Sequence, residues 1–131
     1  YQNINQNHPQ IVACIPWHWD SQENGCNSNN MIAQSFCKLG TQLWGEGNLN
    51  WRGATAFDAV LIILKVIEQC KSENSQALLK DMDKYFKQQQ RGVRGVTGNI
   101  QFEKTGDRLN PPTEIVAVKW SLAQQKWQWA I

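Results

Sequence analysis

The spacing of hydrophobic positions changes along the chain and divides it into predicted elements. Residues 11–15 (Ile-Val-Ala-Cys-Ile) form a short continuous apolar run that ends at Pro16. Such a run predicts a buried strand of an α/β sheet. Residues 17–30 are rich in Asn, Ser, Asp and Gly, which predicts a loop leaving the carboxyl end of that strand.

Apolar residues then recur at helical spacing over three segments. The first predicted helix covers residues 31–43, with Ser28 or Asn29 as its N-cap. The second runs from about residue 50 to residue 70. The third begins after Ser72 or Ser75, its two candidate caps, and is stopped by Gly92.

The second predicted helix is the most apolar. One stripe along it holds Ala56, Val60, Ile63, Leu64 and Ile67, and three further apolar residues widen it. A helix of this kind is buried on most of its sides. It therefore requires a sheet beneath it and another layer or a partner above.

The remaining residues show the period-two alternation of strands. Residues 96–102 predict a half-buried strand, and residues 115–120 and 126–131 predict two more. Residues 121–125 between the last two strands can close a hairpin. No linker is long enough to divide the chain. We therefore predict one α/β domain over residues 1–131, with three helices, a small mixed sheet and a C-terminal β-hairpin.

Composition narrows the function classes. The chain has 131 residues, and its formal net charge is +2, from 13 Lys and Arg against 11 Asp and Glu. This balance gives no strong field for nucleic acid or an anionic membrane. Lys84, Lys87, Arg91 and Arg94 cluster without interleaved aromatic residues, so we expect no nucleic-acid partner. Residues 59–64 are the longest apolar run, far below the roughly 20 residues of a membrane span.

The chain begins at Tyr1, with no leader sequence. We therefore expect a processed chain or a piece of a larger protein. Glutamine and asparagine are abundant, at 15 and 12 residues.

Four cysteines, Cys14, Cys26, Cys37 and Cys70, are irregularly spaced and form no CxxC pair. Zinc binding therefore finds little support, and no metal or cofactor is expected. Cys14 and Cys70 lie in apolar patterns that favour buried free thiols. Cys26 and Cys37 can form a disulfide if the compartment is oxidising, or stay reduced.

Residues 17–20 (Trp-His-Trp-Asp) are the most suggestive short motif. They follow a predicted strand at the end where ligands bind in open α/β sheets. Trp17, His18 and Trp19 are candidate ligand contacts, since aromatic faces stack on ligands or hold cationic groups. The alternative is that both tryptophans pack under the following loop.

Catalytic motifs are not found. Residues 92–98 contain several glycines, but a helix precedes them and a strand follows, the reverse of a phosphate-binding loop. No Gly-x-Ser-x-Gly motif occurs, and the carboxylates, Asp58 among them, fall on helix faces or turns where solvation explains them. We expect no enzyme activity.

The order of these motifs resembles a known family. The motifs are a strand ending at residues 15–16, then residues 43–45 (Leu-Trp-Gly), 50–59 (Asn-Trp-Arg-Gly-Ala-Thr-Ala-Phe-Asp-Ala), 95–102 (Gly-Val-Thr-Gly-Asn-Ile-Gln-Phe), 106–107 (Gly-Asp) and 115–118 (Ile-Val-Ala-Val). Together they resemble the C-terminal third of the type I periplasmic binding proteins, in the branched-chain amino-acid (Leu/Ile/Val-type) branch of ABC-importer receptors.

The resemblance implies a two-lobed α/β flytrap that closes on an amino acid or similar solute and then docks on a membrane permease, in the periplasm or another extracytoplasmic compartment. Relatives of this fold are ligand-sensing domains of membrane receptors or kinases, which is the alternative function, and a small enzyme is a further alternative. Residues 57–58 and 106–107 match structural positions. Trp17 and His18 match a loop near the cleft.

This chain is much shorter than such proteins. The region that anchors the ligand's amino and carboxylate groups in the family has no counterpart here. We therefore expect the chain to be a C-terminal fragment that binds amino acids weakly or not at all by itself. Because its sheet edges and apolar helix would lack covers, we also expect it to self-associate, for instance by exchanging strands.

Overall fold

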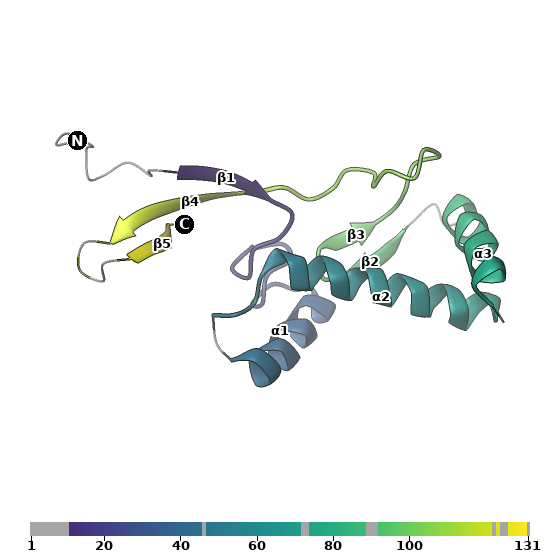
Figure 1. Ribbon diagram of the computed structural model, residues 1–131, viewed down its shortest axis with the longest axis horizontal. Coiled ribbons are helices and arrows are strands. Elements are labelled where there is room, and N and C mark those ends of the chain that lie inside the picture. Colours follow the sequence, from purple (N-terminus) through teal and green to yellow (C-terminus); the bar gives the residue numbers. More distant parts are fainter. Residues whose placement is uncertain are drawn as a thin grey trace. The chain divides into compact units, whose positions relative to one another are not determined.

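A computed structural model describes residues 11–45, 47–71, 74–88, 92–121, 123 and 126–130, with the backbone alone for residues 87, 88, 126, 127, 129 and 130. The chain forms two compact units. Unit 1 combines residues 1–15 with 113–131, and unit 2 comprises residues 16–112. Figure 1 shows the elements of each unit.

Unit 1 is a three-stranded antiparallel sheet in the order β1-β4-β5. Strand β1 (Ile11–Ile15) pairs with β4 (Glu114–Ser121), and β4 pairs with β5 (Lys126–Ala130). The predicted C-terminal hairpin is therefore confirmed. Val116 is buried and Ile115 is exposed, as the alternation along this strand predicts.

Burial of β1 was predicted incorrectly. Ile11, Val12 and Cys14 are exposed, because β1 is an edge strand and, among the described strands, pairs with β4 alone. Trp120, near the end of β4, is also exposed.

Unit 2 contains three helices and a short hairpin. The helices are α1 (Met31–Trp44), α2 (Trp51–Cys70) and α3 (Ser75–Gln88). The hairpin joins β2 (Val93–Gly95) to β3 (Gly98–Ile100) through a two-residue turn. The predicted α/β class with three helices is confirmed. The pairings of described strands are all antiparallel, so the sheet is not mixed there.

Asparagine caps each helix. Asn30 Oδ1 accepts from the amides of Ile32 and Ala33, and Asn50 and Asn74 cap α2 and α3 in the same way. Asparagine is among the best N-caps because its short side chain reaches the free amides of the first turn. The predicted caps Ser28, Asn29 and Ser75 are not used, and Ser72 lies outside the described residues.

Two hydrophobic clusters hold unit 2. One gathers Trp17, Phe36, Ala33 and Ala54 with the turn residue Val96, and Phe57 packs against it. The other, at the far end of α2, is built from Val66, Tyr85 and Val93, with Cys70 packed against it. Cys70 is therefore half-buried rather than fully buried as predicted.

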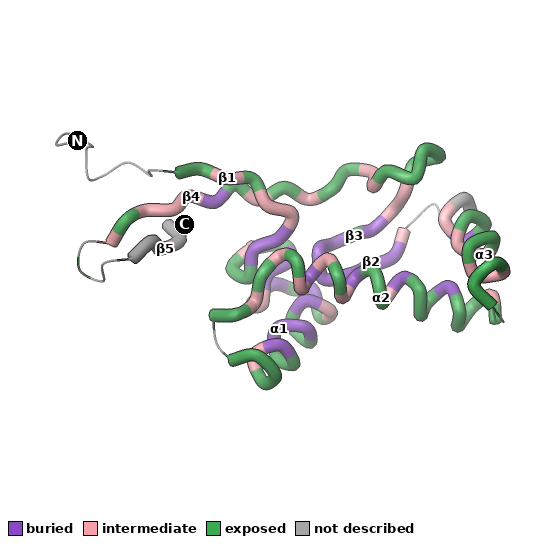
Figure 2. The backbone as a smooth tube through the Cα atoms, in the orientation of Figure 1, coloured by how far each residue is buried: buried purple, intermediate pink, exposed green. Residues whose placement is uncertain are grey.

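The face of α2 that packs inside unit 2 is not the one predicted. Its buried positions are Ala54, Asp58, Ile62 and Val66, spaced four residues apart. The predicted stripe, with Val60 and Leu64 at its centre, is exposed instead. Buried and exposed residues alternate along α2 (Figure 2). The described elements of unit 2 cover one side of this helix, so the more apolar side remains open.

Candidate functional site

The loop between β1 and α1 is folded tightly by its own hydrogen bonds. Trp17 Nε1 donates to the Asn24 carbonyl at 2.6 Å, and the Cys26 amide donates to the Trp19 carbonyl at 2.7 Å. A disulfide joins Cys26 to Cys37, so the loop is tied covalently to α1. The structure thus resolves the open question of these two cysteines in favour of the disulfide.

The three candidate ligand contacts in this loop have different environments. Trp17 is 1% exposed and packs edge-on against Phe36, with 5.6 Å between ring centroids. His18 is buried, and its Nδ1 accepts from the Asp20 amide at 3.3 Å. Trp19 is 43% exposed, with its ring centroid 5.4 Å from that of His18. Trp17 therefore has the packing role, and Trp19 presents its aromatic surface to the outside.

Asp58 organises the turn of the β2–β3 hairpin. It is 4% exposed on α2, and its two oxygens accept from the Val96 amide at 2.6 Å, the Thr97 amide at 2.9 Å and Thr97 Oγ1 at 2.6 Å. A buried carboxylate needs such donors to offset its lost hydration. Solvation on a helix face was the wrong explanation for Asp58, whereas the structural role implied by the family resemblance agrees with this geometry.

The hairpin has little space beside Asp58. A Cβ atom built on Gly95 would lie 2.5 Å from Asp58 Oδ1, and Gly98 has a φ of 94°. Glycine is required at both positions, at the first for close approach and at the second for its left-handed backbone. The predicted strand over residues 96–102 is therefore interrupted, since Val96 and Thr97 form the turn.

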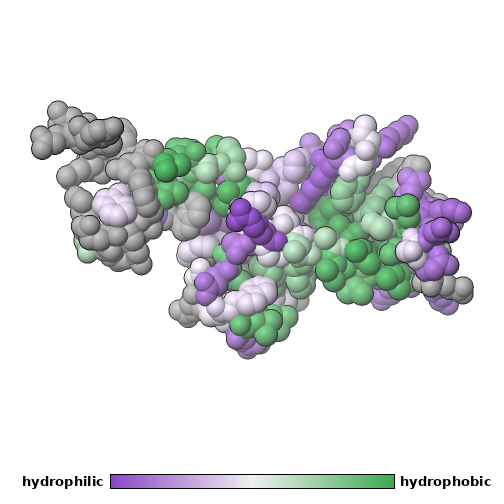
Figure 3. Space-filling model, in the orientation of Figure 1, coloured by the Kyte–Doolittle hydropathy of each residue, from purple (hydrophilic) through white to green (hydrophobic). Residues whose placement is uncertain are grey.

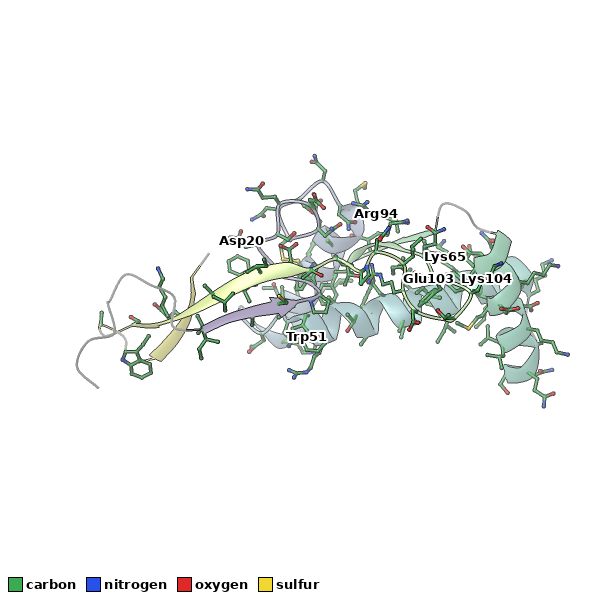
Figure 4. The ribbon with its side chains drawn as sticks, turned by 90° about the horizontal axis from the view of Figure 1, so that it is seen from above. Asp20, Trp51, Lys65, Arg94, Glu103 and Lys104 are labelled. Carbon is green, nitrogen blue, oxygen red and sulfur yellow. A yellow bond between two sulfur atoms is a disulfide. The ribbon has the colours of Figure 1, made fainter. Side chains whose placement is uncertain are left out.

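The cap of α1 extends into this network. Asn30 Nδ2 donates to the Gly95 carbonyl at 2.8 Å and to Asn24 Oδ1 at 3.2 Å. Arg94, whose side chain is labelled in Figure 4, donates to the same Asn24 oxygen at 3.3 Å. The loop, α1 and the hairpin are thus connected through two buried asparagine side chains.

Arg108 closes the network from the other side of the turn. Its Nη1 donates to Thr97 Oγ1 at 2.7 Å, and its Nη2 donates to the carbonyls of Thr97 and Asn99 at 3.1 and 3.0 Å. Burial lowers the pKa of the Arg108 guanidinium, and the charge of Asp58 opposes that shift. The network (Asp58, Thr97, Arg108, Asn30 and Asn24) fixes the loop that carries His18 and Trp19 against α2.

This arrangement is suited to holding a rigid binding surface. Cys26 is bonded to Cys37, so its thiolate cannot serve as a nucleophile beside His18. His18 Nδ1 accepts a hydrogen bond from the backbone amide of Asp20. Across the described ranges, no three His, Cys, Asp or Glu residues gather to hold a metal ion. Nor is any helix in those ranges long and apolar enough to cross a membrane.

The chain is similar to one part of a known binding protein. Neither protein-family profiles nor curated proteins match it in sequence. Among solved structures, it superposes on a leucine-binding protein of Thermotoga maritima with a TM-score of 0.66 and 17% identity, over 92% of this chain. The match covers 30% of that protein, so the chain spans less than a third of its length.

The fold follows from this superposition. The chain has the α/β fold of part of a type I periplasmic binding protein.

Several residues of the site were not found from the sequence. Asn24 and Asn30 gave no signal beyond the loop composition of residues 17–30, Thr97 was assigned to a strand, and Arg108 gave no signal. The hydrogen bonds that define these residues join positions far apart in the sequence. Asn30 and Gly95 are separated by 65 residues, and Asp58 and Thr97 by 39. The signals in the sequence were the family-like motifs at residues 50–59 and 95–102, which contain Asp58 and Thr97.

Proposed function

We propose that this chain is the C-terminal part of an extracytoplasmic solute-binding protein, the receptor component of an ABC importer for an amino acid. The observation that carries this proposal is the superposition of 92% of the chain on a leucine-binding protein. The complete protein would bind its solute between two lobes, close, and dock on a membrane permease. Closure would be a shift in population toward the state that the solute stabilises.

Trp19 is the residue of this chain with the best position for solute contact. It is partly exposed, beside His18, on a loop held by a disulfide and by the Asp58 network. Its ring can cover an aliphatic side chain or an ammonium group. The His18 ring lies beside that of Trp19, with 5.4 Å between their centroids, and Trp17 packs in the core.

The disulfide supports a location outside the cytoplasm. Cys26 and Cys37 are joined, and Cys37 is 6% exposed. Disulfides persist in oxidising compartments such as the bacterial periplasm and are rare in the cytosol. An extracytoplasmic receptor is consistent with this bond, whereas a cytosolic protein is not expected to keep it.

Calorimetric titration with a panel of amino acids tests the proposal. The titration is done on the 131-residue chain and on the protein isolated from its source with antibodies against this chain. We expect the isolated protein to be about three times as long, as the 30% coverage implies. We expect it to bind one member of the panel with a Kd near or below about 1 µM, and the 131-residue chain to bind more weakly than about 1 mM.

Each outcome has a defined meaning. Failure of the longer protein to bind any amino acid would refute the proposed solute class. If the isolated protein had only 131 residues, the proposal that this chain is part of a longer protein would be refuted. Micromolar binding of an amino acid by the 131-residue chain would refute the expectation that it lacks part of the binding site. In the longer protein, Trp19→Ala should weaken binding at least about tenfold, whereas Trp44→Ala, a change of another exposed tryptophan, should not.

A further inference from the structure

Hydrophobic side chains gather over α2 (Figure 3), whereas the loop between β1 and α1 is mostly polar and contains a chemically reactive pair of residues. Asn24 is followed by Gly25, and the dipeptide Asn-Gly occurs once in the sequence. In such a pair the backbone nitrogen of the second residue can attack the side-chain amide of the first. Glycine has no side chain to hinder that attack.

The fold requires this pair. A Cβ atom built on Gly25 would lie 2.6 Å from the Trp19 carbonyl oxygen, so a larger residue does not fit there. Asn24 is 8% exposed, and its Oδ1 accepts from Asn30 Nδ2 at 3.2 Å and from Arg94 Nη2 at 3.3 Å. The packing of the loop thus keeps glycine after an asparagine that belongs to the network of the site.

The reaction open to this pair is deamidation through a cyclic imide. The Gly25 nitrogen loses its proton and attacks Asn24 Cγ, so that a new N–C bond forms and the Cγ–Nδ2 bond breaks. The leaving nitrogen takes up a proton and departs as ammonia. Water then opens the imide. Attack of water on Cγ gives aspartate, and attack on the main-chain carbonyl carbon gives isoaspartate.

The folded loop opposes the first step. The Gly25 amide donates to the Ser21 carbonyl at 2.8 Å, and the Asn24 carbonyl of the same peptide group accepts from Trp17 Nε1 at 2.6 Å. Because the peptide group is planar, the lone pair of the deprotonated nitrogen points where the N–H pointed, toward Ser21 and away from Asn24 Cγ. Attack therefore requires this peptide group to turn, which breaks both hydrogen bonds.

We propose that Asn24 is a site of spontaneous deamidation, which the folded loop suppresses and which opening of the loop releases. Cys26, the residue after Gly25, is bonded to Cys37 on α1, so the disulfide is the covalent restraint on that opening. Reduction of the disulfide raises the population of the open loop. The proposal does not depend on solute binding, since water is its only co-reactant.

The two products differ in how they fit the network. Aspartate at position 24 keeps an oxygen that accepts from Asn30 and Arg94, and its charge strengthens the hydrogen bond from the Arg94 guanidinium. Isoaspartate continues the main chain through the side-chain carbon, which adds a methylene group to the backbone and displaces the carbonyl that accepts from Trp17. The loop therefore closes again around aspartate but not around isoaspartate.

Peptide mapping by mass spectrometry measures the reaction in the 131-residue chain at mildly alkaline pH. Deamidation raises the mass of the peptide that contains Asn24, because an OH group replaces NH₂. We expect Asn24 to react at least about tenfold faster in the reduced chain than in the oxidised chain, because the rate follows the population of the open loop. Asn74 is the internal control. It is exposed, precedes Ser75 and caps α3, so its rate should not respond to the disulfide.

Two tryptophan variants test the hydrogen bond that holds the peptide group. Trp17→Phe removes the donor to the Asn24 carbonyl and should raise the Asn24 rate at least about tenfold below the melting transition. Trp19→Phe is the matched control, since Trp19 is partly exposed, and it should leave the rate unchanged.

A double-mutant cycle tests the fit of the aspartate product. Asn24→Asp should remain folded, and Arg94→Gln should lower the melting temperature more in the Asn24→Asp background than in the unmodified chain. Equal Asn24 rates in the oxidised and reduced chains, a rate indifferent to Trp17→Phe, or equal effects of Arg94→Gln in the two backgrounds would each overturn the proposal.

Discussion

Replacement of Asp58 by alanine should destabilise unit 2 more than any other single change of a carboxylate. The side chain is 4% exposed and accepts hydrogen bonds from two amides and one hydroxyl. A hydrogen bond to a charged group contributes about 1.5–3 kcal/mol, and these contributions are not additive. Removal of one member of a buried charged network costs about 3–5 kcal/mol, and we expect a loss in that range.

The loss arises from the donors left behind. In Asp58→Ala, the amides of Val96 and Thr97 remain buried without the Asp58 acceptor, and Arg108 loses the favourable charge of Asp58. In Asp58→Asn, one side-chain oxygen still accepts a hydrogen bond, but the NH₂ group that replaces the other oxygen cannot accept from the donors of the turn. We therefore expect Asp58→Asn to cost about 2 kcal/mol, less than alanine but still clearly measurable.

Urea unfolding and amide hydrogen exchange measure this effect. A loss of 3–5 kcal/mol lowers the urea midpoint by about 1–3 M when the slope is about 1–3 kcal/mol per molar. Exchange at the Val96 and Thr97 amides should accelerate before exchange in α1, because the hairpin opens locally. The control is Asp83→Asn, an exposed carboxylate on α3, with an expected change within about 0.5 kcal/mol. Equal midpoints for Asp58→Ala and Asp83→Asn would refute the structural role of Asp58.

Three further predictions concern the loop and its supports. Reduction of the Cys26–Cys37 disulfide should lower the free energy of unfolding by about 2–3 kcal/mol, because the bond closes a short loop. Melting temperatures measured with and without reductant check this prediction, and equal temperatures would contradict it. Trp17→Phe should cost about 2–3 kcal/mol through a lost buried hydrogen bond and a cavity, whereas Trp19→Phe should cost less than about 0.5 kcal/mol in the same denaturation assay. Asn30→Ala should cost about 2–3 kcal/mol, since it removes both an N-cap and a bond to the hairpin, and a loss of only about 1 kcal/mol would show that the cap acts alone.

The helices were predictable because their signals are local. The apolar spacing that predicts a helix from about residue 50 to residue 70 lies within one segment, and α2 (Trp51–Cys70) begins and ends where that spacing places it. The hairpin of β4 and β5 was predictable for the same reason, since alternation on both sides of a short loop defines it.

Which face of α2 is buried could not be predicted, because it depends on which other elements pack against the helix. The stripe around Val60 is more apolar than the face around Asp58, and hydrophobicity alone assigns the interior to the wrong side. The turn at Val96 and Thr97 shows the same limit. Alternating residues predicted a continuous strand, but the hydrogen-bond acceptors on Asp58, 38 residues away from Val96, stabilise a turn instead.

The position of the candidate contacts was partly predictable. Residues 17–20 were identified from their place after a strand and from their aromatic content. Which tryptophan faces outward depends on the Trp17 hydrogen bond to Asn24 and on its packing against Phe36, both of which are tertiary contacts. The sequence alone therefore identified the loop, and the structure was needed to separate Trp19 from Trp17.

The pairing of β1 with β4 has a consequence for synthesis of the chain. Ile11 pairs with Val118, 107 positions later, and all of unit 2 lies between them. At a translation rate of about 5–20 residues per second, roughly 5–20 s pass between synthesis of β1 and of its partner. Throughout that interval an apolar strand has no partner, whereas unit 2 can fold as it emerges. The nascent chain should therefore be most dependent on chaperones before residue 118 is made, and a sequence change in β1 should affect yield more than it affects the stability of the finished protein.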